Sequence, residues 1–334
     1  MVMDEKIDFV ITWVDDSDPK WREAFDSYSA KDDREINTDA CRYRDWGTLR
    51  YWFRGVEKFA PWVNKIYFVT YGHMPEWLNT DNPKLVIVKH EDYIPSVYLP
   101  TFSSHTIEYN FYRIKGLSEK FVYFNDDMFL INFVPSYRFF KNGLPCDIGG
   151  LSVVTNRGLF GCCLYRAIDL IKECFNKKEV ISQNRNKWYS MEYPRLSLHN
   201  LLKYRQTTFR GFINHHQPQG YLKETYDDVW GHYEKILHRT CSNKFRTYGN
   251  VAPWLLRYWQ LASGNFTPYN VFKDGEVFHL NDDNISESVD CICHQKKKIV
   301  CLNDHEKVTH FEDYKERLLN AFEQILPDKC SFEL

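Results

Sequence analysis

An amide and two carboxylates interrupt a run of aromatic and aliphatic residues, FVYFNDDMFL, at residues 121–130. The run is typical of a buried strand, and Asn125, Asp126 and Asp127 come where that strand would end. A buried carboxylate without a partner is costly or shifts its pKa, so adjacent carboxylates on an apolar strand need a cation, a proton or water. Asn and Asp also form solvated turns, and from this stretch alone that interpretation stays open.

A divalent metal that assists phosphoryl transfer takes oxygen ligands from a few carboxylates and amides, while substrate phosphates fill its other positions. Candidate ligands occur in both halves of the chain: Glu108, Asp126, Asp127, Asn303 and Asp304. The last two lie in IVCLNDH, which repeats the pattern of apolar residues followed by Asn-Asp. HLNDDN, at residues 279–284, has this pattern too, so the pattern does not choose between the two downstream copies.

Arginines supply the donors that phosphates need, because a guanidinium binds two phosphate oxygens at once. Arg50 and Arg54 are four residues apart on one face of a predicted helix, beside apolar positions. The remaining candidates are Arg42, Arg44 and Arg113 in the first half and Arg246 in KFRTYGN. For most of these arginines, simple surface solvation is the alternative.

His216 stands in HHQPQGY, where Pro218 and Gly220 predict a rigid loop. A loop histidine with a pKa near neutrality is suited to accept a proton from an attacking hydroxyl. A structural or solvated histidine is the competing interpretation. The chain has no G-x-x-x-x-G-K-[ST], G-x-G-x-x-G or G-x-S-x-G motif, so a bound nucleotide would use another loop.

Composition narrows the classes of partner. The 334 residues include 43 basic and 45 acidic side chains, a formal net charge of −2, which gives no reason to expect nucleic acid as a ligand. An anionic substrate would have to be bound locally. Aromatic residues make up 17% of the chain, which suits the stacking surfaces that sugars and bases offer.

The sequence also predicts a compartment. MVMDEKIDFVITWVDD is interrupted by acidic residues and is typical of neither a secretory signal nor a membrane span, and no run of 18 apolar residues follows. Ten cysteines in this context predict free thiols and a cytoplasmic protein. Cys291, Cys293, His294 and Cys301 raise zinc as an alternative, although their spacing fits no common structural zinc site.

The first half alternates apolar strand patterns with amphipathic segments. Strands are predicted in IDFVITWV, KIYFVTYG, KLVIVKH and FVYF, and helices in LRYWFRGVEKF and in IEYNFYRIKGL, which Ser103, Ser104 or Thr106 would cap. This order predicts an α/β fold with an open, largely parallel, Rossmann-like sheet. Ligands in such sheets lie beyond the carboxyl ends of the strands, so DDSDP and NDD would face one crevice.

Three parts are predicted along the chain. Residues 1–150 form an α/β part, and residues 151–265 form a helical insertion or cap. Residues 266–334 return to the α/β core and end in an amphipathic helix, YKERLLNAFEQIL.

Several segments, taken in order, resemble the four conserved regions of the Stealth family of sugar-phosphate transferases. They are IDFVITWVDDSDP, LRYWFRGVEKFAPWVNKIYFVTYGHMPEWLN, LPTFSSHTIEYNFYRIKGLSEKFVYFNDDMF, HQP with KFRTYGNVAPWLLRYW, and CLND. The resemblance spans residues 7–304. It implies that residues 1–150 are the nucleotide-sugar-binding part, that residues 151–265 are the acceptor-side part and that residues 266–334 return to the catalytic core. It implies transfer of a hexose 1-phosphate from a nucleotide sugar, typically a UDP-sugar such as UDP-GlcNAc, to a hydroxyl of a glycan acceptor, with release of UMP.

The resemblance also implies roles for residues at matching positions. Glu108, Asp126, Asp127, Asn303 and Asp304 correspond to the metal neighbourhood, which implies Mg²⁺ or Mn²⁺ as the cofactor. His216 matches the histidine of the family's H-x-P and is implied as the general base. Arg246 matches the basic residue of the following F-R segment, and Asp15 matches part of the nucleotide pocket. The acceptor is expected to be a capsular or cell-surface glycan, and a lipid-linked acceptor would place the enzyme at the inner face of the membrane.

The chain departs from the family pattern in places. Asp16 stands where the first region commonly has glycine, so this turn is expected to differ from that of the family, and His105 lies at a variable position. Residues 151–206 match nothing in the family, and acceptor choice is predicted to reside there. A metal-dependent glycosyltransferase that releases UDP would use the same local chemistry, and an aromatic-rich glycan-binding module is a further alternative.

Overall fold

The computed structural model describes residues 6–30, 44–304 and 308–334. Its strands are β1 (Ile7–Thr12), β2 (Ile66–Thr70), β3 (Leu85–Lys89), β4 (Lys120–Phe124), β5 (Met128–Leu130), β6 (Phe140–Lys141), β7 (Leu144–Asp147), β8 (Gln219–Leu222), β9 (Thr267–Pro268), β10 (Gly275–His279) and β11 (Ile299–Asn303).

The helices in the first half are α1 (Pro19–Ser29), α2 (Leu49–Phe59), α3 (His90–Tyr93), α4 (Ser104–Tyr109) and α5 (Gly158–Cys174). Those in the second half are α6 (Lys177–Gln183), α7 (Arg185–Trp188), α8 (Pro194–Lys203), α9 (Lys223–Ser242), α10 (Trp254–Ala262), α11 (Ile285–Cys293) and α12 (Phe311–Ile325). Short 3₁₀ turns occur at Ser96–Tyr98, Phe111–Arg113 and Ser136–Arg138.

The central sheet has the order β3-β2-β1-β4-β8, and all its pairings are parallel except that of β8 with β4. Val10 in β1 lies opposite Tyr67 in β2 and Tyr123 in β4. The predicted α/β class with a largely parallel sheet is therefore confirmed.

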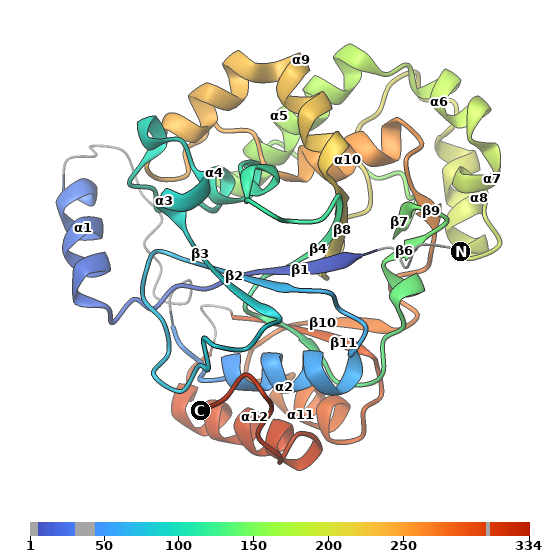
Figure 1. Ribbon diagram of the computed structural model, residues 1–334. Coiled ribbons are helices and arrows are strands. Elements are labelled where there is room, and N and C mark those ends of the chain that lie inside the picture. The colour runs from blue at the N-terminus through green and yellow to red at the C-terminus, as the bar shows by residue number, and fades with distance from the viewer. Residues whose placement is uncertain (1–5, 31–43, 305–307) are drawn as a thin grey trace.

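Both faces of this sheet are covered, which explains why its strands are continuous apolar runs. In Figure 1, α3, α4, α5, α9 and α10 lie above the sheet, and α2, α11 and α12 lie below it. Along β1, Phe9 and Ile11 belong to the core on the α2 side, whereas Val10 belongs to the core on the α9 side. The alternation follows from the two-residue period of a strand.

A second sheet, β10-β11-β5, brings a distant part of the chain to the end of β4. β5 follows the NDD segment directly, and it pairs antiparallel with β11, so that Met128 lies opposite Cys301. The amide of Leu302 donates a hydrogen bond to the carbonyl of Asp127 at 2.8 Å. This pairing places CLND beside NDD.

The three predicted parts share sheets. Residues 151–265 form helices α5 to α10, and they also supply β8, the antiparallel edge strand of the central sheet. Residues 266–334 supply β10 and β11, and β9 pairs with β7 of the first part.

One predicted helix is shorter than expected. The pattern in IEYNFYRIKGL predicts a helix that continues towards Gly116, but α4 ends at Tyr109. Asn110 donates a side-chain hydrogen bond to the Thr106 carbonyl at 2.8 Å, and a 3₁₀ turn follows. An asparagine that binds the backbone in this way competes with helix propagation.

Candidate active site

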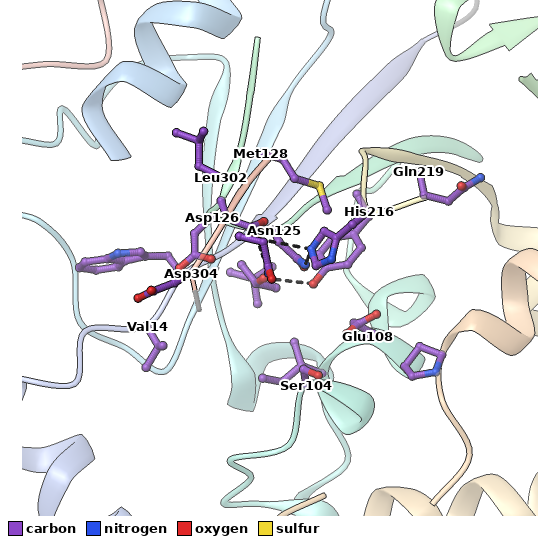
Figure 2. A pocket seen from close by; sticks show the side chains of 18 of the residues that line it. Val14, Ser104, Glu108, Asn125, Asp126, Met128, His216, Gln219, Leu302 and Asp304 are labelled. Carbon is purple, nitrogen blue, oxygen red and sulfur yellow. Dashed lines mark hydrogen bonds and ion pairs between the residues drawn. The ribbon is translucent and has the colours of Figure 1, made fainter. Parts of the chain in front are cut away.

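A cavity of about 740 Å³ lies beyond the carboxyl ends of β1, β4 and β11. Its wall includes the segments that follow these strands, the loop before β8, and α4. The main polar lining residues are Glu108, Asn125, Asp126, Asp127, His216, Arg246, Asn303 and Asp304. Figure 2 shows Glu108 and Ser104 across the cavity from Asp126 and Leu302. The cavity thus collects candidates separated by up to about 200 residues of chain.

Asp127 lies at the centre of the polar cluster. Its Oδ2 atom accepts a hydrogen bond from Asn303 Nδ2 at 3.1 Å and lies 3.4 Å from His216 Nε2. Burial alone would raise the pKa of Asp127, but the His216 charge and hydrogen bonds from His216, Asn303 and Cys301 outweigh it and lower that pKa. Its second oxygen, Oδ1, is buried and has no hydrogen-bond partner among the described residues.

Two further carboxylates face the same space with raised pKa values. Desolvation and then the Asp127 charge raise the pKa of Asp126 to about 7, although its side chain reaches the solvent in the cavity. Burial raises the pKa of Glu108 to about 7, against the opposing influence of Arg246, Ser104 and His216. Negative charge is therefore in excess here, and protons or a cation must balance it.

His216 projects from the loop before β8 towards Asp127. Its Nε2 atom lies 3.1 Å from Asn125 Nδ2, so the first residue of NDD contacts the ring as well. Burial opposes the charged form of the ring, but the Asp127 carboxylate outweighs burial and raises the pKa of His216. The imidazole remains partly exposed to the cavity.

The two downstream Asn-Asp copies differ in position. Asn303 contacts Asp127, whereas in HLNDDN the Asp282 carboxylate accepts hydrogen bonds from Thr309 outside the cavity. Of the residues in HLNDDN, the first, His279, lines the cavity, and its Nδ1 atom lies 3.3 Å from Asn303 Oδ1. The structure thus places CLND, and not HLNDDN, beside the NDD carboxylates.

Asp304 is in the cavity wall, but its oxygens are already paired. Arg44 binds it through Nε at 2.9 Å and Nη2 at 2.6 Å, and Trp46 Nε1 donates at 3.2 Å. The carboxylate therefore fixes the segment before α2, and Asn303 is the member of CLND that faces Asp127.

The structure does not bring three of the predicted substrate-binding arginines to the cavity. Arg54 is buried against the C-terminal segment, where it binds Glu333 at 2.7 Å and the Leu326 carbonyl at 2.8 Å. Arg50 lies over the ring of Trp77, and Arg113 stacks on Tyr112. Helical periodicity could not show this, because it does not reveal which face of α2 meets the C-terminal segment.

The other candidates for phosphate or nucleotide contact are distributed as follows. Arg246 lines the cavity, where its charge acts on Glu108, and Arg44 lines it as well. Asp15 lies one residue beyond the lining residue Val14, and its carboxylate accepts hydrogen bonds from Ser17. Arg42 falls outside the described residues.

Comparisons with known proteins place this architecture in a family. Residues 5–33 match Stealth protein conserved region 1, and residues 42–146 match Stealth protein conserved region 2. The capsular polysaccharide phosphotransferase WcwK of Streptococcus pneumoniae is 41% identical over 332 residues, which cover 98% of both chains. The chain belongs to the Stealth family. It is a phosphotransferase.

Further Stealth relatives span the same length. The receptor polysaccharide phosphotransferase WefC of Streptococcus gordonii is 41% identical, with 99% of this chain and 100% of that protein covered. The exopolysaccharide phosphotransferase cps2G of Lactiplantibacillus plantarum is 34% identical, with 98% and 96% covered.

A weaker likeness links the chain to a solved structure, the apo form of the bifunctional glycosyltransferase WbbM. The two are 10% identical, with a TM-score of 0.44, and the match covers 97% of this chain and 52% of that one.

Among the described residues of this Stealth protein, no helix has the length and apolar character needed to cross a bilayer.

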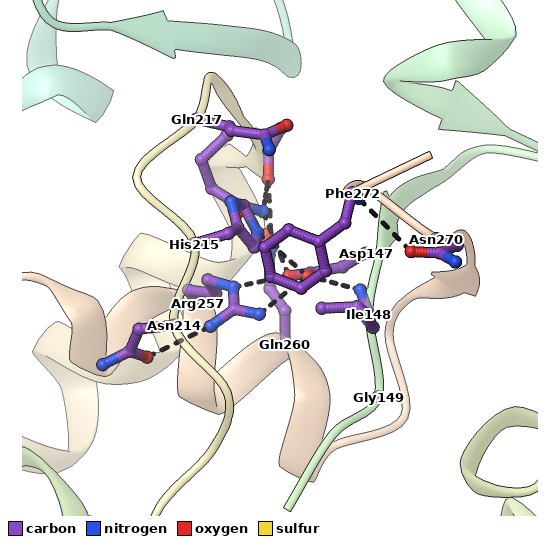
Figure 3. A network of polar contacts seen from close by, with 12 residues as sticks. Asp147, Ile148, Gly149, Asn214, His215, Gln217, Arg257, Gln260, Asn270 and Phe272 are labelled. Carbon is purple, nitrogen blue, oxygen red and sulfur yellow. Dashed lines mark hydrogen bonds and ion pairs between the residues drawn. The ribbon is translucent and has the colours of Figure 1, made fainter. Parts of the chain in front are cut away.

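Sequence reasoning missed a buried network behind the His216 loop, shown in Figure 3. Arg257 in α10 binds both oxygens of Asp147, through Nε and Nη2, each at 2.8 Å. His215 Nε2 lies 3.2 Å from Asp147, and Asn214 accepts a hydrogen bond from Tyr258 at 2.8 Å. A lone arginine in the apolar stretch WLLRYW was the available signal, because a buried charge needs a partner.

The loop is held on its other side too. Gln217 Oε1 accepts a hydrogen bond from Arg138 Nη2 at 3.1 Å, and Arg138 pairs with Asp274 at 2.9 Å. His215 and Gln217 are thus anchored inward on both sides of His216, and His216 is left to face the cavity.

The alternative zinc site does not assemble. Cys291 and Cys293 lie in α11, and His294 pairs with Asp290 at 2.9 Å. Cys301 instead faces the active site, where its sulfur, an Asp127 oxygen and a His216 nitrogen lie within 4.8 Å of one another. Among the described residues, no other three His, Cys, Asp or Glu side chains bring their ligand atoms this close together.

Proposed function

We propose that this Stealth protein transfers a hexose 1-phosphate from a UDP-sugar to a hydroxyl of a glycan acceptor. The products are a phosphodiester and UMP. The observation that carries the proposal is the meeting of NDD, CLND, Glu108, His216 and Arg246 in one cavity at the carboxyl ends of the strands. This set provides cation ligands, a base and, in Arg246, a hydrogen-bond donor for phosphate within one space.

The side chains fit a divalent cation, Mg²⁺ or Mn²⁺. Asp127 Oδ1 is a buried carboxylate oxygen with no described partner, and Asp126 and Glu108 add carboxylates whose ionised forms are disfavoured as they stand. Asn303, which contacts Asp127, would complete an all-oxygen set of the kind these cations prefer. When bound, the cation would neutralise the charge of the diphosphate.

The chain's own groups account for the remaining steps. The acceptor oxygen bonds to the phosphorus that carries the sugar, and the bond from that phosphorus to the bridging oxygen breaks as UMP leaves. The acceptor proton passes to Nε2 of His216, which the anchored loop holds beside Asp127. Arg246 would bind phosphate oxygens on the Glu108 side of the cavity.

Aromatic residues beside the β1 end suit the nucleoside. Trp13, Tyr71 and Phe102 line the cavity, close to the Asp15 loop. Flat rings at this end would stack on uracil or ribose, whereas a cation held by the carboxylates would bind the diphosphate further along.

The relatives' names point to the acceptor. WcwK and WefC are named for capsular and receptor polysaccharides, so we take a cell-surface glycan under assembly as the acceptor. A lipid-linked acceptor and a nucleotide-sugar donor would meet at the cytoplasmic face of the membrane, and we propose that the enzyme works there.

Product analysis with a panel of nucleotide sugars and a glycan acceptor tests the proposal. Phosphotransfer releases UMP and leaves phosphorus in the glycan, which ³¹P NMR detects as a phosphodiester. Release of UDP with a phosphorus-free glycan would instead identify a glycosyltransferase. If the nucleotide sugar stays intact while the protein binds the glycan, the protein would be a binding module.

A further inference from the structure

A second surface carries features that the proposed reaction does not use. Helix α8 exposes three leucines, Leu198 (61% exposed), Leu201 (56%) and Leu202 (73%). Met191, in the segment just before the helix, is 85% exposed. We call these four residues the leucine face.

The leucine face points away from the protein because the opposite side of α8 is the one that packs. Asn200 is fully buried, and its amide donates to the carbonyls of Gly149 and Trp188, at 2.7 and 2.8 Å. Leu198, Leu201 and Leu202 have the i, i+3, i+4 spacing of a single helix face, and all three are exposed. Asn200 and the partly buried Leu196 therefore attach the helix, while its other three leucines face outward, unlike the apolar residues of an ordinary surface helix.

The charge around the leucine face is positive. Between residues 185 and 210 the one acidic side chain is Glu192, and the basic ones are Arg185, Lys187, Arg195, Lys203, Arg205 and Arg210. Arg195 and Arg205 are exposed on α8 and just after it, and neither pairs with a carboxylate among the described residues. This segment therefore carries an excess of positive charge, although the net charge of the whole chain is −2.

A basic cavity adjoins this segment. It has a volume of about 500 Å³, reaches Glu192 beside Met191, and is lined by Lys141, Lys273, Lys296, Lys297 and Lys298. Lys296 and Lys297 pair with Asp290 and Glu276. The other three lysines form no ion pair with a described carboxylate. Positive charge therefore extends beyond the N-terminal end of α8, where Glu192 lines the cavity.

We propose that the leucine face is a docking surface for an anionic lipid bilayer. Exposed leucines flanked by arginine and lysine are the pattern by which an interfacial helix inserts its apolar side below lipid headgroups while its basic side chains meet anionic phosphates. A second copy of the chain fits less well, because pairing this face with itself would bring Arg195 and Arg205 towards like charges. The inference does not depend on the identity of the donor or the reaction.

Co-sedimentation with vesicles tests this surface. We expect the full-length protein to bind vesicles of phosphatidylcholine and phosphatidylglycerol in equal parts, to bind pure phosphatidylcholine at least about 10-fold more weakly, and to be released by added KCl. Replacing Leu198, Leu201 and Leu202 together by glutamine should lower the partition coefficient at least about 10-fold.

Two matched controls separate the surface from general effects. Val97→Gln changes an exposed apolar residue elsewhere and should bind as the wild type does. Arg195→Gln/Arg205→Gln should weaken binding to the anionic vesicles, whereas Lys20→Gln/Lys115→Gln should not. The leucine variant should keep the melting temperature of the wild type, which shows that it folds.

Three results would overturn the proposal. One is that the wild-type protein does not bind anionic vesicles. Another is a leucine variant that binds them as the wild type does. The third is a wild-type dimer, measured by light scattering, that the leucine substitutions convert to monomer, since the face would then serve self-association.

Discussion

At the scale of single residues, Asp127 joins the two halves of the site. It follows β4, contacts Asn303 from β11 and His216 from the loop before β8, and keeps one buried oxygen without a described partner. Removing its charge would leave the surrounding backbone pairing unchanged, because that pairing uses the Asp127 carbonyl.

Asp127→Asn should therefore lower turnover by about 100-fold or more while the melting temperature changes little, since it weakens charge compensation in the transition state. Steady-state UMP release and thermal unfolding give the two readouts. Asp283→Asn, in the exposed HLNDDN copy, is the matched control and should keep full activity. Undiminished activity in excess EDTA would contradict the cation on which this prediction rests.

His216 carries the second residue-scale prediction. A base must be neutral to accept a proton, so the rate should rise with pH through the pKa of His216 and then level off. Asp127 raises that pKa, which delays the rise towards higher pH, and a cation that neutralises Asp127 should move it back. His216→Ala should lower kcat at saturating acceptor and remove the acidic limb of the pH profile. Retention of kcat within a few fold, or of the limb, would exclude His216 as the base.

At the scale of elements, the loop between α8 and β8 is positioned by buried charges on other elements. Asp147 at the end of β7 and Arg257 in α10 form an ion pair with both side chains almost fully buried, and His215 joins it. Burial, followed by the Arg257 charge, lowers the pKa of His215 to about 4, so His215 stays neutral when folded.

The free energy of unfolding should depend on pH because the pKa of His215 is lowered in the folded protein. The ordinary pKa of histidine is about 6.5, and that of folded His215 is about 4. Between these pH values the unfolded chain binds a proton at residue 215 and the folded chain does not. Stability is therefore lost as pH falls through this window, by roughly 1–2 kcal/mol at pH 5. His215→Gln should remove that contribution, so its stability relative to the wild type should improve from pH 7 to pH 5 in urea unfolding. A constant difference across this range would show that His215 does not titrate as described.

The sequence showed some of these elements and not others, for physical reasons. Continuous apolar runs predict strands covered on both faces, and β1 to β4 have such runs. β8, by contrast, includes Gln219 and Gly220 at an edge, and its pairing with β4 depends on tertiary contacts. The same limit applies to α2, where periodicity indicated a face for Arg54 but not its partner Glu333, far away in sequence.

At the scale of the whole molecule, the site exists because two sheets meet. NDD and CLND were recognisable as candidates from the pattern of apolar residues followed by Asn-Asp, but the choice of CLND over HLNDDN depends on the pairing of β5 with β11. Pairing register between distant strands is not encoded in either local stretch. Arg44 was a candidate from the sequence, but its pairing with Asp304 could not be predicted for the same reason.

The meeting of these sheets concentrates carboxylates whose protonation should govern cation binding. The pKa values of Glu108 and Asp126, both raised to about 7, mean that folding takes up protons there between their ordinary pKa values and pH 7. Their contribution to stability is present at low pH and is lost as pH rises through 7. A cation that binds the ionised carboxylates would restore stability where the protons have left.

Mg²⁺ should therefore raise the melting temperature more at pH 8 than at pH 6, when compared with NaCl of equal ionic strength. Glu108→Gln combined with Asp126→Asn should reduce the pH dependence of this shift, because the groups that exchange a proton for the cation are gone. Differential scanning fluorimetry across this range gives the shift directly. An equal shift at both pH values, or a larger one at pH 6, would mean that these carboxylates do not hold the cation, and the ligands would have to be sought elsewhere in the cavity.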